Sequence, residues 1–195
     1  MLQEKLKDHH IILASGSPRR QQFFKDLLID FEIRLKPVQE VYPSHLSGKQ
    51  ITNYLAELKA AAFDGELNTG DILITSDTIV WHKGKAMEKP KDPAQAMEMI
   101  KSLSGKTHEV ITSVCFKTPE RVHTVDATTR VTFSHLDEDE IQFYIDRFRP
   151  FDKAGAYGIQ EWIGLIGVEH IEGSYFNVVG LPTHLVYQTL IEIAE

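Results

Sequence analysis

The stretch that most constrains the fold is residues 11–20, Ile-Ile-Leu-Ala-Ser-Gly-Ser-Pro-Arg-Arg. Its apolar half, 11–14, predicts a short buried strand. The polar Ser-Gly-Ser ends that strand, and Ser17 and Pro18 suit the N-cap and first position of a helix that continues to Leu28. The stretch therefore predicts a strand, a tight polar turn and a helix in direct succession.

Arg19 and Arg20 lie in the first turn of that helix, where the helix dipole places partial positive charge. Each arginine is expected to cost roughly 0.3–1 kcal/mol there unless an anion is present. A phosphate would accept hydrogen bonds from the helix N-terminal N–H groups and from a guanidinium. The alternative is a solvated arginine pair on a surface helix, and the motif alone does not decide between the two.

The remaining patterns predict a mixed α/β fold in which a central sheet is flanked by helices. Apolar residues recur at helical spacing in 51–62, 93–103, 137–148 and 183–194. Extended or alternating patterns predict strands at 31–35, 71–81, 108–117 and 121–133, and a strand pair around 162–172. The segments between them, including 38–47, 82–92 and 151–160, are predicted loops. A length of 195 residues fits one domain, 1–195, or one domain with two lobes.

Charge and cysteine content limit the classes of function. The net charge of −7 argues against a protein that binds nucleic acid polymers, although a local basic cleft would still accept a nucleotide. Cys115 is the only cysteine, which excludes a disulfide framework and favours a reducing compartment. No run approaches the roughly 18 apolar residues of a membrane helix, and no signal peptide is recognisable. We therefore expect a cytoplasmic protein without a membrane partner.

Asp77 interrupts the apolar strand predicted at 71–81. A carboxylate buried in a strand needs partners, because burying it alone is costly. It is either a structural aspartate bonded to a turn or a catalytic or metal-binding group, and ligand sites of α/β folds gather at strand ends. Lys59, on the helix predicted at 51–62, taken alone indicates only a solvated side chain.

A set of segments, in order and spanning nearly the whole chain, resembles the Maf family of nucleoside triphosphate pyrophosphatases. The matching segments are Leu13–Arg20, Ser76–Val80, Glu88–Pro90, Leu103–His108, Asp152–Gln160 and Gly173–Pro182. The resemblance implies an elongated, two-lobed α/β fold of the Maf and inosine triphosphatase type, with a nucleotide cleft. It also implies hydrolysis of a nucleoside triphosphate to the monophosphate and diphosphate.

The resemblance assigns roles to particular residues. Asp77 matches the position of the proton acceptor, and Glu40 matches a further acidic position, expected to hold metal. Arg19, Thr78 and Gln160 match the specificity positions of the subfamily that acts on dTTP and UTP. Polar positions that line the family's cleft are matched by Ser15, Arg19, Arg20, Lys59, Glu88, Lys89 and Lys153.

Two positions depart from the family's usual pattern. Ser76 stands where many members have alanine, which would alter hydrogen bonding to Asp77, and Gln39 stands where an acid often precedes Glu40, which would weaken metal binding. Neither departure removes a residue that the chemistry requires.

The expected cofactor is a divalent cation, Mg²⁺ or Mn²⁺, held by carboxylates and triphosphate oxygens. Asp77 would act as general base toward the attacking water, or instead as a metal ligand. Two other functions stay open: a pyrophosphatase for 7-methyl-GTP or another modified nucleotide, and a nucleotide-binding regulator of cell division. A homodimer is a further expectation.

Overall fold

The computed structural model describes all 195 residues, which form two compact units. The first unit comprises Met1–Asp77, Thr112–Ala127 and Gly180–Glu195, and the second comprises Thr78–Ile111 and Thr128–Val179. Three long strands contribute residues to both units, namely β3 (Asp71–His82), β5 (Thr107–Lys117) and β6 (Val122–Phe133).

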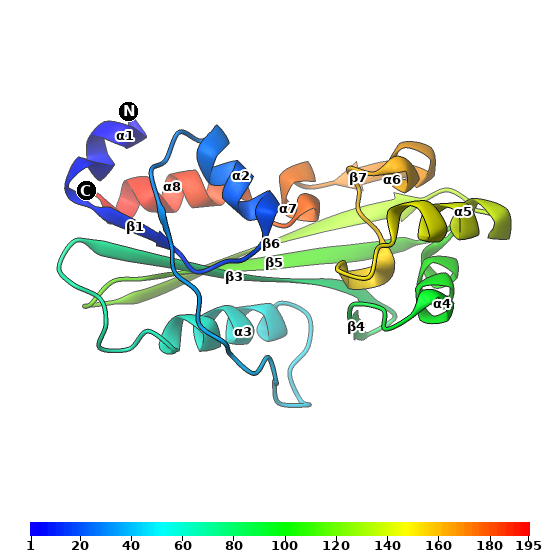
Figure 1. The fold of residues 1–195 in the computed structure, drawn as a ribbon, viewed down its shortest axis with the longest axis horizontal. Coiled ribbons are helices and arrows are strands. Elements are labelled where there is room, and N and C mark those ends of the chain that lie inside the picture. The colour runs from blue at the N-terminus through cyan, green and yellow to red at the C-terminus, as the bar shows by residue number, and fades with distance from the viewer. The chain divides into compact units, whose positions relative to one another are not determined.

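The sheet of the first unit is built around β1 (His10–Leu13), which pairs in parallel with β2 (Glu32–Ile33) on one side and with β3 on the other. Helix α3 (Lys49–Ala61) covers one face of this sheet, and α2 (Pro18–Asp26) and α8 (Thr183–Ile193) cover the opposite face (Figure 1). The short α1 (Leu2–Lys5) and η1 (Leu6–Asp8) precede β1, and α1 packs against α8.

Helix α3 packs on this sheet through a dry apolar cluster. Ile12, Leu73 and Cys115 project from three strands onto Ala56 and Ala60 of the helix, and each is at most 1% exposed. Strands covered on both faces need apolar side chains on both, which explains the continuous apolar runs of β1 and of the first half of β3.

The second unit combines antiparallel pairing with short helices. In it, β4 (Lys85–Met87) pairs with the end of β3, and β7 (Val168–Glu172) pairs with β6, both antiparallel. Helix α4 (Pro93–Leu103) packs against α5 (Glu138–Phe148), which also contacts α6 (Trp162–Gly167). The remaining elements are η2 (Ala154–Ala156) and α7 (Tyr175–Val179).

The predicted mixed α/β fold with a central sheet and flanking helices is confirmed. The strand, turn and helix predicted at 11–28 are present as β1 and α2, and the Ser17 side chain accepts a hydrogen bond from the Arg20 N–H at the N-cap. Helix α2 ends at Asp26, two residues early. None of the helices has the length and apolar character needed to cross a membrane.

The strand pair predicted around 162–172 is half wrong, because 162–167 form α6 and only 168–172 form a strand. A short apolar run does not distinguish a strand from a buried helix turn by its periodicity. Gly164 lets this helix pack against the preceding loop: a Cβ there would lie 1.9 Å from the Ile159 carbonyl oxygen, so only glycine allows this close approach. The strand predicted at 31–35 shortens to Glu32–Ile33, and α1, β4 and α7 were not predicted.

Candidate active site

The turn between β1 and α2 is held by its own serines. The Ser15 hydroxyl accepts a hydrogen bond from the Ser17 N–H at 3.3 Å, and the side-chain amide of Gln21 donates to the Ser15 carbonyl at 3.1 Å. Ser15 is buried. These bonds set the direction in which α2 leaves the sheet, and therefore where its first turn places the two arginines.

Arg20 is a bridging side chain rather than a solvated one. Its Nε donates to the Gly180 carbonyl at 3.0 Å and its Nη1 donates to the Ser76 carbonyl at 3.1 Å. Burial lowers the pKa of Arg20 from its usual value, while the nearby Asp77 carboxylate opposes that shift. The surface alternative for the arginine pair is thus wrong for Arg20, which brings positive charge to the side of β3.

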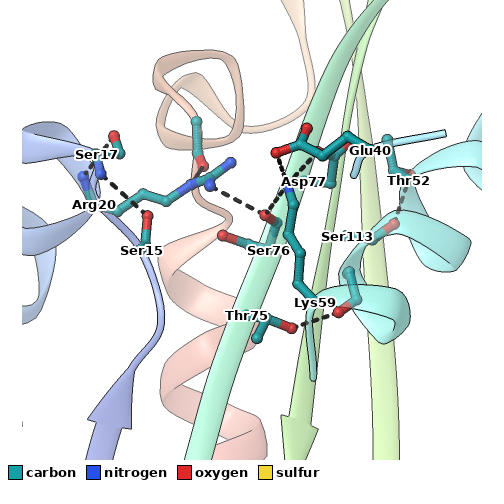
Figure 2. Close-up of polar contacts among 12 residues, drawn as sticks. Ser15, Ser17, Arg20, Glu40, Thr52, Lys59, Thr75, Ser76, Asp77 and Ser113 are labelled. Atoms are coloured by element: carbon teal, nitrogen blue, oxygen red, sulfur yellow. Dashed lines mark hydrogen bonds and ion pairs between the residues drawn. The ribbon is translucent and has the colours of Figure 1, made fainter. Parts of the chain in front are cut away.

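Lys59 brings two of the predicted acidic residues together. Its Nζ lies 2.8 Å from Asp77 Oδ1 and 3.2 Å from Glu40 Oε1, and it also donates to the Ser76 carbonyl at 3.4 Å. Figure 2 shows Lys59 reaching this carbonyl from α3 while Arg20 reaches it from α2. The Lys59 side chain is 18% exposed, so this lysine is not the solvated helix residue that it would be on its own.

A cavity of about 230 Å³ lies beside this group, and Arg20, Glu40 and Lys59 contribute to its wall. One part of its wall is charged and another part is apolar, which suits a ligand with an anionic portion and a flat or apolar portion. The lining residues are Ala14, Gly16, Arg20, Leu35, Lys36, Val38, Glu40, Lys59, Phe63 and Ser76.

Arg19 lies half-buried on α2 in the first unit, and the second unit holds the remaining predicted residues. Lys153 Nζ lies 2.8 Å from Asp152 Oδ1 and 3.0 Å from Glu161 Oε1. The Gly155 N–H donates to the Glu88 carbonyl at 3.2 Å, which ties the glycine-containing loop to the segment that follows β4. Thr78 follows Asp77 in β3 and is half-buried, whereas the predicted residues Glu88, Lys89 and Gln160 are exposed.

Nothing in the sequence singles out Glu161, although its carboxylate is bound to the predicted ligand Lys153. It lies at the N-cap of α6, directly before the segment predicted to be extended. The tie of Arg20 to Gly180 was missed as well, because a contact across 160 residues leaves no local pattern.

The Ser76 hydroxyl makes no hydrogen bond and so does not contact Asp77. Successive side chains of a strand point to opposite faces, and Asp77 faces Lys59 of α3. The predicted effect of Ser76 on hydrogen bonding to Asp77 is therefore not seen. The predicted effect of Gln39 on metal binding stays a prediction.

Glu40 and Asp77 fit the donor set expected for a hard divalent cation. Both carboxylates contact one ammonium, so they lie within reach of a common cation. No cluster of three or more histidine, cysteine, aspartate or glutamate side chains suited to a metal occurs in the chain. Mg²⁺ is commonly held by one or two carboxylates together with substrate phosphates and water, so two carboxylates suffice when the substrate supplies the rest.

The class of fold is defined by comparison with solved structures. The chain is similar to the Ham1 protein of Staphylococcus aureus, with a TM-score of 0.54 and 16% sequence identity over 92% of this chain and 99% of that one. A likeness at this identity concerns the fold alone. A sequence model described as "Maf-like protein" matches residues 10–193, so the chain belongs to the Maf family.

Curated relatives match nearly the full chain. A protein of Flavobacterium johnsoniae named "dTTP/UTP pyrophosphatase" is 62% identical over 97% of this chain and 98% of its own length. Proteins of the same name from Christiangramia forsetii and Bacteroides fragilis are 60% and 49% identical, over 99% and 96% of this chain and 98% of their own lengths. The resemblance to the Maf family that the sequence motifs indicate is confirmed.

Proposed function

We propose that this protein is a nucleoside triphosphate pyrophosphatase that hydrolyses dTTP and UTP to the nucleoside monophosphate and diphosphate. The observation that carries the proposal is the ion-paired group of Lys59, Asp77 and Glu40 beside a cavity that Arg20, Glu40 and Lys59 line. It combines cations for phosphate oxygens with a carboxylate for proton transfer. The names of the relatives support the choice of nucleotide.

In the proposed reaction, water attacks the α-phosphorus and Asp77 accepts its proton. A bond forms between the water oxygen and the α-phosphorus, the bond to the oxygen that bridges to the β-phosphorus breaks, and diphosphate leaves. The ion pair with Lys59 holds the Asp77 carboxylate in place for this transfer. Arg20 and Lys59 offset the negative charge of the triphosphate, a task in which Arg19, Lys89 and Lys153 are expected to share.

We propose Mg²⁺ or Mn²⁺ as the cofactor, with Glu40 as the residue that would hold it together with triphosphate oxygens. When bound, such a cation withdraws charge from phosphate oxygens and makes diphosphate a better leaving group. Asp77 as metal ligand rather than general base is the alternative reading of the same residue. Either role requires its carboxylate.

Base selection is assigned to Arg19, Thr78 and Gln160, and the polar residues Ser15 and Glu88 are expected to contact the nucleotide. These roles rest on the family resemblance. Arg19→Ala is expected to blur base preference or weaken nucleotide binding, and unchanged selectivity across nucleotides would count against its role. A cytoplasmic location suits the nucleotide substrate and the one buried cysteine, and a homodimer stays a prediction.

The proposal is tested by a product assay with Mg²⁺ or Mn²⁺ across dTTP, UTP, CTP, ATP, GTP and 7-methyl-GTP. Diphosphate is measured separately from orthophosphate, because the two products distinguish attack at the α-phosphorus from attack at the γ-phosphorus. Diphosphate together with dTMP or UMP is the expected result.

Other outcomes would replace the proposal with one of its rivals. Diphosphate from 7-methyl-GTP alone would keep the reaction and overturn the assignment of the base. Saturable nucleotide binding without turnover would favour a binding regulator, and this reading would gain further support if the Asp77→Asn protein kept its effect in the cell.

A further inference from the structure

Glu161 connects a predicted ligand to the interior of the second unit. Its Oε1 lies 3.0 Å from Lys153 Nζ, and its Oε2 accepts a hydrogen bond from the Tyr144 hydroxyl of α5. The same hydroxyl accepts a hydrogen bond from the Gly158 N–H at 3.0 Å. Helix α5, the loop after it and the start of α6 are therefore joined through one carboxylate and one hydroxyl.

The network is built from groups that are largely withdrawn from water. Tyr144 is fully buried, and the side chains of Lys153 and Glu161 are 12% and 24% exposed. Burial, followed by the hydrogen bond to Glu161, raises the pKa of Tyr144, so its hydroxyl keeps its proton and remains a donor. An ammonium and a carboxylate at this depth need their partners, because each is costly to bury alone.

Gly158 allows the ion pair to form. A Cβ at this position would lie 2.9 Å from Glu161 Cδ and 3.0 Å from Lys153 Cε, closer than Cβ contacts normally come. The Glu161 N–H also donates to the Gly158 carbonyl at 3.0 Å, which closes a turn around Gln160. Glu161 thus fixes Lys153 through its side chain and Gln160 through its backbone.

We propose that Glu161, held by Tyr144, is a positioning residue for the nucleotide-binding side chains Lys153 and Gln160. The inference rests on the proposed function, in which Lys153 binds triphosphate oxygens and Gln160 selects the base. Glu161 acts through Lys153 and Gln160 and not on the nucleotide itself, because both of its carboxylate oxygens are already bound, one by Lys153 and the other by Tyr144. Asp152 also contacts Lys153, but it is 62% exposed and adjacent in the chain, so it places no comparable constraint on the ammonium.

The first test is Glu161→Gln, which keeps an oxygen for the Tyr144 hydroxyl but removes the charge that pairs with Lys153. Lys153 would serve the triphosphate, which all nucleotides share. We therefore expect KM to rise about tenfold for dTTP, UTP and CTP alike, with kcat changed less than about twofold and base preference retained.

The second test is Tyr144→Phe, which leaves the carboxylate in place and removes the hydroxyl that holds Glu161 and the Gly158 N–H. The turn around Gln160 then loses its support. We expect the ratio of kcat/KM between dTTP and CTP to fall about tenfold. The matched control is Glu172→Gln, which removes a carboxylate 3.6 Å from Arg130 on the exposed pair of β6 and β7 and should leave both readouts unchanged.

Thermal unfolding of each variant separates positioning from a purely structural role. The inference is overturned if both variants have a lowered Tm but keep the wild-type KM and base preference. It is also overturned if KM is unchanged or lowered in Glu161→Gln. The affinity of the wild type and of each variant for dTTP is also measured by calorimetry without divalent metal, because this measurement requires no turnover. A wild-type protein that binds dTTP without hydrolysing it refutes the proposed reaction, and the positioning role is then decided by these affinities. A wild-type protein that does not bind dTTP overturns both.

Discussion

At the scale of single residues, the alternation of β3 decides which polar groups meet the cations. The Thr75 hydroxyl donates to the Ala56 carbonyl of α3 at 2.6 Å, and Asp77 contacts Lys59 of the same helix. Ser76, between them, offers only its carbonyl to Arg20 and Lys59. One residue of shift in the strand would replace the carboxylate at Lys59 with a hydroxyl, so register and chemistry are linked here.

Asp77→Asn tests the proposed proton acceptor. The amide keeps the size of the side chain but neither accepts a proton at neutral pH nor carries charge to a metal. We expect kcat to fall about 10²–10⁴-fold with a circular dichroism spectrum like that of the wild type. Asp64→Asn is the matched control, because Asp64 also pairs with a lysine, Lys117, on an exposed part of the first unit. Normal turnover in a folded Asp77→Asn protein would refute the assignment.

Ser76→Ala tests the unpartnered hydroxyl. A buried hydroxyl without a hydrogen bond has lost its contact with water and gained nothing in return, so its removal should raise the free energy of unfolding by up to about 1 kcal/mol. Denaturant unfolding measures the change.

Ser113→Ala is the contrasting variant for that measurement. The Ser113 hydroxyl is buried and lies 2.6 Å from both the Thr52 hydroxyl and Asn53 Oδ1, so its loss should lower the free energy of unfolding by about 1–3 kcal/mol. If Ser76→Ala lowers the free energy of unfolding as much as Ser113→Ala does, the Ser76 hydroxyl has a hydrogen-bond partner in solution.

At the scale of elements, the loop between α5 and α6 depends on glycine for its path. Gly155 has a φ of +69°, and a Cβ there would lie 3.0–3.2 Å from three side-chain atoms of Val80. Both the backbone conformation and the close approach to β3 therefore favour glycine. This loop carries Lys153 and Gln160, so its path also determines where these two predicted ligands lie.

Gly155→Ala should lose stability for two reasons, backbone strain and overpacking against Val80, whereas Gly105→Ala should lose stability through backbone strain alone. Gly105 has a similar φ of +64°, but nothing lies within 4 Å of the position of its Cβ. We expect Gly105→Ala to cost about 1 kcal/mol from the backbone alone and Gly155→Ala about 2–4 kcal/mol from backbone and overpacking together. Urea unfolding of the two variants measures the difference. If both variants lose the same free energy of unfolding, the Val80 side chain moves aside at no cost.

Elements with local signals were predicted, and those that depend on distant contacts were not. Ser17 and Pro18 mark the start of α2 in the sequence itself, whereas the helix at 162–167 depends on how Gly164 lies against the Ile159 carbonyl. The same holds for the site. The sequence predicts a special role for Asp77 because a charge in an apolar strand needs a partner, but the identity of that partner, Lys59, depends on how α3 packs on the sheet.

At the scale of the whole molecule, net charge and local charge oppose each other. The chain carries a net charge of −7, which repels a triphosphate at long range. Arg20 and Lys59 concentrate positive charge around one cavity, so attraction would operate only at short range. Affinity for an anionic nucleotide would then depend on a few fixed contacts rather than on the general field of the protein.

The stability of the whole chain should depend on pH through a buried histidine of the second unit. His108 is buried, its Nε2 lies 2.7 Å from the Tyr157 hydroxyl, and the rings of Phe133 and Tyr157 pack edge-on against it. Burial lowers the pKa of His108 from 6.5 to about 4. Between these values the unfolded chain binds the proton and the folded chain does not.

The contribution of His108 to the free energy of unfolding is therefore fully present above about pH 6.5. It is lost as the pH falls toward 4, and the free energy of unfolding then decreases by up to about 1.4 kcal/mol per pH unit. His108→Gln keeps a polar partner for Tyr157 and does not titrate, so the free energy of unfolding should depend less steeply on pH in this variant. Urea unfolding between pH 4.5 and 7.5 measures both slopes, and His135→Gln, at an exposed position of the same unit, should keep the wild-type slope. If His108→Gln also keeps that slope, His108 is protonated in the folded protein, and the acid sensitivity of the chain originates in its carboxylates.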